Sequence, residues 1–147
     1  MPGLDLLIRH HQIRWFGIGS GSYTGTNLNT SISILSGAVS MPEGTPSITR
    51  TIVGAGGPSN PIGTASLSPI PNSSIKRTGK MSVTYYLLIP NKEGSGDSVD
   101  ITEVGLFVDK PYNAFSSDAT ILVAYRTFPL IKKTNDFSLL FKWTISV

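Results

Sequence analysis

The clearest pattern in this chain is an alternation of apolar and polar residues, which is strongest at the C-terminus. Over residues 137–147 every odd position is apolar, and most even positions hold Ser, Thr or Lys. Because successive side chains of a strand point to opposite faces, a period of two gathers the apolar groups on one face. The segment therefore predicts a core strand.

Strand signals recur along the rest of the chain. Residues 81–89 repeat the alternation and end at Pro90, which cannot donate to a central ladder. Runs rich in β-branched and aromatic residues predict four more strands, at 13–18, 47–53, 104–108 and 121–127. Helical periodicity is nearly absent, and the only helical turn that the pattern suggests lies at residues 4–11.

Turn-rich connectors separate these strands. Residues 91–100 and 111–118 have the polar, glycine-containing composition of loops. Residues 54–74 carry no charge and are rich in Gly, Pro and Ser, which predicts a long loop or an extended arm. Residues 1–12 are expected to form an extended N-terminal arm. The whole chain, 1–147, is thus predicted to be one all-β domain, an antiparallel β-sandwich or jelly-roll-like barrel.

Composition favours an assembled state. The chain has 147 residues, which suits a single domain, and only 14% of them are charged. Soluble globular proteins carry about 25% charged residues. A surface so poor in charge has to be covered by Ser, Thr, Asn and Gly, or by a partner.

Charge and cysteine content argue against several function classes. The net charge is +3, but the Lys and Arg residues are scattered in runs of two at most, so nucleic acid is not an expected partner. Absence of Cys excludes disulfides and Cys-type zinc sites. No apolar run approaches the roughly 18 residues of a membrane span, and the N-terminus has no signal-peptide pattern.

No set of residues in the sequence predicts catalysis, a metal or a cofactor. The glycine-rich stretch Gly17–Gly21 is followed by turn-forming residues and not by the helix that a dinucleotide site needs. His10 and His11 are adjacent, so they would point apart on a strand. The acids of the 91–100 loop match no established calcium-loop spacing. The sequence therefore predicts a protein that is not an enzyme.

Glu103 stands out because a carboxylate lies among strongly apolar neighbours. A buried carboxylate needs hydrogen-bond donors or a cationic partner. If residues 101–108 and 119–127 form a hairpin, Arg126 is the candidate partner.

The C-terminal half, from Asp100 to Val147, resembles structural proteins of tailed-bacteriophage virions. These proteins carry an I-x-E-[IV]-G-L-F block, which stands here as Ile101–Phe107. Strands around Arg126 and Trp143 follow in the same order as in those proteins. The stretch Phe16–Gly21 is similar to the glycine-rich strand exit near their N-termini. The motif residues are Ile101, Glu103, Gly105, Leu106, Phe107, Arg126 and Trp143.

The resemblance implies a virion structural protein, made in the cytoplasm of a bacterial host and placed on the particle surface. Because the chain ends on its strongest strand with no repetitive shaft, a capsid decoration (cement) protein is favoured. Such a protein would bind the major capsid protein or other virion proteins as a symmetric oligomer, a trimer being favoured, with the segments 1–12 and 54–74 reaching out to neighbours. A tail, neck, baseplate or fibre component is the alternative.

A carbohydrate-binding β-sandwich is a third reading, because such modules present exposed aromatic residues on loops. Tyr23, Tyr112 and Phe115 lie in predicted loops.

Overall fold

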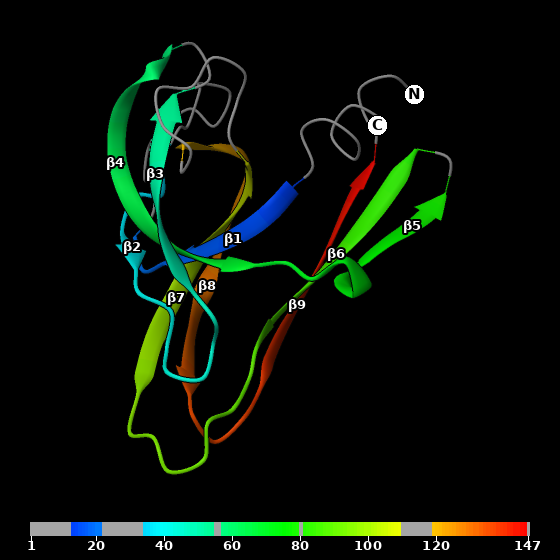
Figure 1. Cartoon of the computed structure of the whole chain (residues 1–147). Helices are drawn as coiled ribbons and strands as arrows, with labels where there is room; N and C mark the ends of the chain where they lie inside the picture. The colour runs from blue at the N-terminus through cyan, green and yellow to red at the C-terminus, as the bar shows by residue number, and fades with distance from the viewer. Residues whose placement is uncertain (1–12, 22–33, 55–56, 80, 110–118, 147) are drawn as a thin grey trace.

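Two β-sheets make up the part of the chain that the computed structural model describes, residues 13–21, 34–54, 57–79, 81–109 and 119–146 (Figure 1). The sheets pack together, so the predicted all-β sandwich is confirmed. The strands are β1 (Ile13–Gly19), β2 (Ala38–Val39), β3 (Ile48–Gly54), β4 (Gly57–Pro69), β5 (Ile75–Gly79), β6 (Ser82–Ile89), β7 (Ser98–Val108), β8 (Ala119–Thr134) and β9 (Leu139–Ser146). A short 3₁₀ turn, η1 (Asn72–Ser74), precedes β5.

The larger sheet closes on itself. Its strand order is β2-β1-β4-β3-β8-β7, and β1 also pairs with β7, so that five strands form a closed barrel with β2 at its side. All of these pairings are antiparallel except the contact between β3 and β8, which is parallel and, among the described residues, joins Thr51 to Ala119 and Ile52 to Thr120. Closure removes the exposed sheet edges that the barrel strands would otherwise present.

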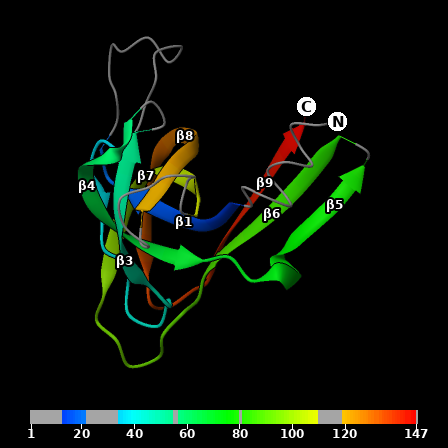
Figure 2. The ribbon, with the colours of Figure 1, turned by 45° about the horizontal axis from the view of Figure 1, so that its top comes forward.

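The smaller sheet has the strand order β5-β6-β9 and projects to one side of the barrel (Figures 1 and 2). Strands β6 and β9 pair in unbroken register from Ser82 opposite Ser146 to Ile89 opposite Leu139. The inner face of β6 packs on the outside of the barrel, where Tyr85 and Leu87 join the main hydrophobic core.

Strands β1 and β7 are buried on both faces, because they lie between the barrel interior and the smaller sheet. Phe16 and Leu106 point outward into the core between the sheets. Phe107 points inward, into a second core with Leu67 and Leu122. This double burial explains why residues 15–19 of β1 and 104–108 of β7 are continuous apolar runs in the sequence.

The prediction of a loop or arm at residues 54–74 is wrong. Residues 57–69 form β4, which pairs with β3 along its length and with β1 at Trp15 and Phe16. Ala65 and Leu67 are buried in the barrel. The segment was missed because its inward side chains are few and small, and its Gly and Pro residues resemble those of a loop.

Other strands differ from prediction mainly in length. β7 begins at Ser98, within the predicted loop, and β8 extends to Thr134. Pro129 lies within β8, but it falls where the β7–β8 register shifts, so no regular ladder bond is lost. The alternation over 137–147 is confirmed in β9, although its inward residues are only half-buried and Phe137 is exposed. The segments predicted as arm and loop at 1–12 and 111–118 lie outside the described residues.

Candidate functional site

The two motifs singled out in the sequence lie side by side in the fold. In the β1–β7 ladder, Gly17 stands opposite Gly105 and Gly19 opposite Glu103. A Cβ on Gly17 would lie 2.7 Å from Leu67 Cδ2, and one on Gly105 would lie 2.7 Å from Leu122 Cδ1. The paired glycines thus make room for the large side chains inside the barrel.

Glu103 is completely buried, and its carboxylate is held by four donors from separate parts of the chain. Oε2 accepts hydrogen bonds from the backbone N–H groups of Gly37 (2.7 Å) and Gly21 (3.3 Å). Oε1 accepts from the N–H of Ser36 (3.1 Å) and from the Tyr125 hydroxyl (2.6 Å). We call this arrangement the Glu103 junction, and it fastens the exit of β1 to the chain that leads into β2.

The predicted pairing of Glu103 with Arg126 is wrong, although the hairpin that suggested it is confirmed. Register places Thr127 opposite Glu103 and Arg126 opposite Val104. Val104 points toward the smaller sheet, so Arg126 lies on the outside of the barrel. Tyr125 stands opposite Gly105, on the face that Glu103 shares, and it supplies the side-chain donor instead.

The glycines at the exit of β1 allow its backbone to approach the Glu103 carboxylate and the Gly37 backbone closely. A Cβ on Gly19 would collide with the Glu103 carboxylate, and one on Gly21 would lie 2.6 Å from the Gly37 nitrogen. The Ser20 N–H donates to the Gly37 carbonyl at 2.9 Å. Gly17–Gly21 is therefore a packing motif, in agreement with its interpretation as a strand exit and not a nucleotide loop.

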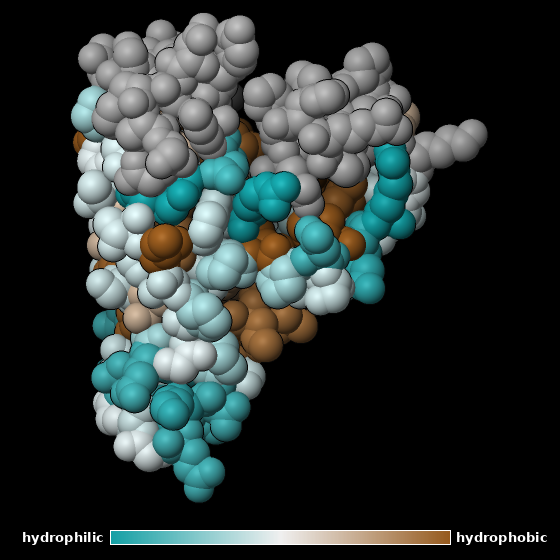
Figure 3. Space-filling model, viewed as in Figure 1, coloured by the Kyte–Doolittle hydropathy of each residue, from teal (hydrophilic) through white to brown (hydrophobic). Residues whose placement is uncertain are grey.

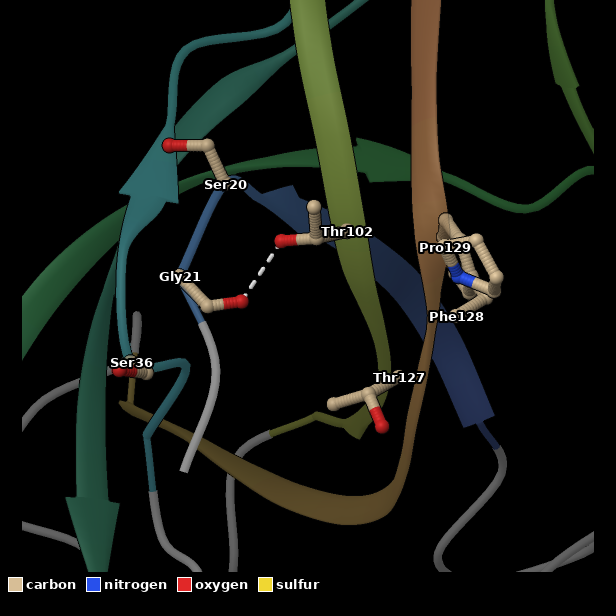
Figure 4. A pocket seen from close by; sticks show the side chains of 7 residues that line it. All are labelled: Ser20, Gly21, Ser36, Thr102, Thr127, Phe128 and Pro129. Carbon is tan, nitrogen blue, oxygen red and sulfur yellow. Dashed lines mark hydrogen bonds between the residues drawn. The ribbon is translucent and has the colours of Figure 1, made fainter. Parts of the chain in front are cut away.

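An open depression lies beside the junction (Figure 4). Thr102 Oγ1 donates to the Gly21 carbonyl at 2.7 Å across it, and Thr127, Phe128 and Pro129 form its other wall at the β8 register shift. Its polar groups are hydroxyls and backbone atoms, and the neighbouring carboxylate already receives four donors. The arrangement is suited to holding loops in place.

Arg126 and Trp143, the last two motif residues, lie apart from the junction. They share two adjoining hollows of about 310 and 360 Å³ between β8 and β9. We call this the β8–β9 groove; its main apolar lining comes from Ile13, Phe128, Phe141, Trp143 and Ile145. The rings of Phe128 and Phe141 have centroids 5.5 Å apart. Hydrophobic surface is visible between the barrel and the smaller sheet in Figure 3.

Two further charged residues are buried and were not anticipated. Arg50 donates from Nε to Thr120 Oγ1 (2.9 Å), forms an ion pair with Asp109, and lies 4.9 Å over the Trp15 ring. Lys133 Nζ donates to the Thr134 carbonyl and lies 5.0 Å from the Phe137 ring centroid. Burial lowers the pKa of Lys133, and Asp136 opposes this effect.

The described residues hold no group of three side chains placed to bind a metal ion. Within the 91–100 loop, Asp97 Oδ2 accepts a hydrogen bond from the Glu43 N–H at 3.0 Å. His10, His11, Tyr23, Tyr112 and Phe115 lie outside the described residues. In the part of the chain that is described, no helix has the length and apolar character to cross a membrane.

Comparison with protein-family models, with curated proteins and with solved structures finds no match to this chain.

Proposed function

We propose that this chain is a non-enzymatic structural component of a tailed-phage virion. The proposal rests on where the fold places the residues that carry the resemblance to virion proteins. Those of the I-x-E-[IV]-G-L-F block are buried in the Glu103 junction and the two cores, and Trp143 and Arg126 line the β8–β9 groove. Residues used in this way maintain a scaffold, and the resemblance concerns particle building and not a reaction.

Exposed apolar side chains support a role in assembly. Leu88 and Leu140 stand opposite each other on the outer face of the smaller sheet and are 50% and 55% exposed. Leu130 on β8 is 60% exposed. Together with the low charge, such groups favour a protein that is partly covered by neighbours.

Within the particle, we place the chain as a capsid decoration (cement) protein. It would bind the major capsid protein through shape and apolar burial, as a symmetric oligomer with a trimer favoured. A tail, neck, baseplate or fibre-associated position is the alternative within the same class.

The copy number in purified particles of the encoding phage tests the proposal, by quantitative mass spectrometry with isotope-labelled peptides of this chain. A count near that of the major capsid protein is expected for decoration. A count near that of portal or baseplate proteins would move the chain to the neck or tail. Absence from the particle would overturn the virion assignment.

A further inference from the structure

The outer face of the smaller sheet carries positive charge alone. The three strands of this sheet contain Lys76, Arg77 and Lys142, and they contain no Asp or Glu. Lys76 and Lys142 point away from the barrel, because the β6 residues opposite them alternate with those that enter the core. Both lysines are exposed. An acidic surface is therefore the complement of this face.

The same face also exposes apolar area. Leu140 and its partner Leu88 come next to Lys142 in the β6–β9 ladder, and the two leucines are 55% and 50% exposed. Apolar groups surrounded by polar and charged ones are the usual composition of a protein interface. We call this surface, formed by Lys76 and the outward side chains of β6 and β9, the cationic face.

A surface of opposite charge lies at the foot of the barrel in Figure 1, where three connecting segments meet. The Glu43 N–H donates to Asp97 Oδ2 at 3.0 Å, and the Lys92 N–H donates to the Asn135 carbonyl at 3.3 Å. These bonds hold together residues 42–45, 91–97 and 135–137, which we call the acidic loop end.

The acidic loop end has four acids and one cation, so its formal charge is 1 − 4 = −3. On the adjoining strand β8, Lys133 is buried and Lys132 stands opposite Asp100, so neither offsets this charge at the surface. Phe137 is 41% exposed and supplies apolar area beside the acids. The four acids, all exposed, are Glu43, Glu93, Asp97 and Asp136, and the cation is Lys92.

The two surfaces of this one chain match each other in charge and in apolar content. Among the residues that the structure describes, neither Lys76 nor Lys142 forms an ion pair with an acid of its own chain. An unrelated acidic protein would satisfy the cationic face alone, whereas a second copy of the chain satisfies both surfaces at once. The charge distribution therefore favours a second copy as the partner.

We propose that copies of this chain associate by placing the cationic face of one copy against the acidic loop end of another. Lys76 and Lys142 of one copy face the acids of the other, and Leu88 and Leu140 face Phe137. The inference deepens the proposed function, on which it rests for the existence of an oligomer, by naming the surfaces that join the subunits.

Sedimentation equilibrium of the full-length protein over a concentration series tests the contact. Lys76→Glu/Lys142→Glu changes the net charge from +3 to 3 − 4 = −1, so general repulsion between copies becomes weaker. The contact itself becomes acid against acid, and association should weaken at least about tenfold. Adding Glu43→Lys/Glu93→Lys to the same chain reverses both surfaces, returns the net charge to +3, and should restore association. The control Thr49→Glu, exposed on β3, should associate like wild type.

Other results overturn the contact. These are a wild type that stays monomeric at every concentration, a cationic-face variant that associates as tightly as wild type, and a four-substitution variant that is folded by circular dichroism but does not regain association. A mass of three chains agrees with the trimer favoured above, and a mass of two with the same charge reversal keeps the contact and replaces the trimer. The copy number in particles tests the virion role separately. Copies that associate in this way but are absent from particles would therefore overturn that role and leave the contact standing.

Discussion

At the scale of single residues, Glu103 is a fully buried carboxylate that forms no ion pair with any residue that the structure describes. Three backbone N–H groups and one hydroxyl donate to it, and a hydrogen bond to an ionised acceptor is stronger than one between neutral groups. The donors come from three segments, which are the exit of β1, the chain that leads into β2, and β8. Glu103 therefore stabilises the fold by fastening loops together.

Replacement of Glu103 by Ala should destabilise the protein by about 3 kcal/mol or more, because several buried donors would be left without acceptors at about 1–3 kcal/mol each. Glu103→Gln should fall between Ala and wild type, since its amide keeps one acceptor oxygen. Urea-induced unfolding measures both. The control Glu93→Ala removes an exposed carboxylate and should change stability by less than about 0.5 kcal/mol. Equal unfolding midpoints for Glu103→Ala and wild type would contradict this account.

The cross-strand glycine pair makes a second prediction at this scale. Gly17→Ala places a Cβ 2.7 Å from Leu67 Cδ2, and overpacking of this kind costs about 1–3 kcal/mol. Thermal unfolding should show a lower melting temperature. Gly96→Ala is the matched control, since its Cβ meets no heavy atom within 4 Å. An equal drop in melting temperature in the control would mean that the loss comes from the backbone preferences of Ala and not from crowding against Leu67.

The sequence predicted the burial of Glu103 but not its surroundings. Its backbone donors lie 66 to 82 positions away in the chain, and every residue type except Pro can supply a backbone N–H. Arg126 was the natural partner on charge grounds, yet neighbouring residues of a strand point to opposite faces. Only the β7–β8 register shows that Tyr125, one position earlier, shares the face of Glu103.

At the scale of elements, the barrel has two short seams among the described residues, one where β1 meets β4 and one where β3 meets β8. The β3–β8 contact is parallel and has two residue pairs in the part of the chain that the structure describes. Arg50 crosses it through its hydrogen bond to Thr120 and its ion pair with Asp109, and Trp15 covers the guanidinium. Side-chain bonds thus reinforce the seam that the backbone ladder leaves short.

Arg50→Met should therefore loosen this seam more than the rest of the barrel. We expect a loss of about 1–3 kcal/mol in unfolding free energy. Hydrogen exchange should accelerate at Ile52 and Thr120 before it does so in the long β7–β8 ladder. Arg14→Met is the control, because Arg14 is exposed on β1. Uniform acceleration over all strands would indicate a global effect and contradict the role of Arg50 at the seam.

Elements with large alternating side chains were predictable, and those with small ones were not. β1, β3, β6 and β9 fall close to their predicted positions because branched and aromatic residues mark them. β4 carries Gly, Ser, Thr and Ala over most of its length, so only Leu67 marks its buried face. A strand that completes a closed barrel needs little apolar area of its own, because its neighbours supply the core.

At the scale of the whole molecule, closure of the barrel depends on pairings between distant segments. β1 pairs with β4 and β7, and β3 pairs with β8, although each pair is far apart in the sequence. Local patterns indicate that strands exist but not which strands become neighbours. The smaller sheet then depends on the barrel, because its inner face packs against the outside of β1, β7 and β8.

The contact between the two sheets should make the protein sensitive to alkaline pH. Tyr85 is 1% exposed between them, and burial raises its pKa to about 12. In the unfolded chain a tyrosine titrates near pH 10. Between about pH 10 and 12 the folded state therefore keeps a proton that the unfolded state releases, so stability falls as pH rises through this window, by up to roughly 2–3 kcal/mol.

Tyr85→Phe removes the titrating group and should abolish this part of the alkaline decline, whatever its effect on stability at neutral pH. The measurement is urea-induced unfolding of wild type and variant below pH 10 and near pH 12. Tyr86→Phe, on the other face of the same strand, serves as the control and should keep the wild-type decline. If Tyr85→Phe loses as much stability as wild type between pH 10 and 12, ionisation of Tyr85 is not the cause of the alkaline decline. A flat profile in Tyr85→Phe alone would tie the alkaline limit of the molecule to this one buried hydroxyl, because deprotonation there places a charge in the core that joins barrel and sheet.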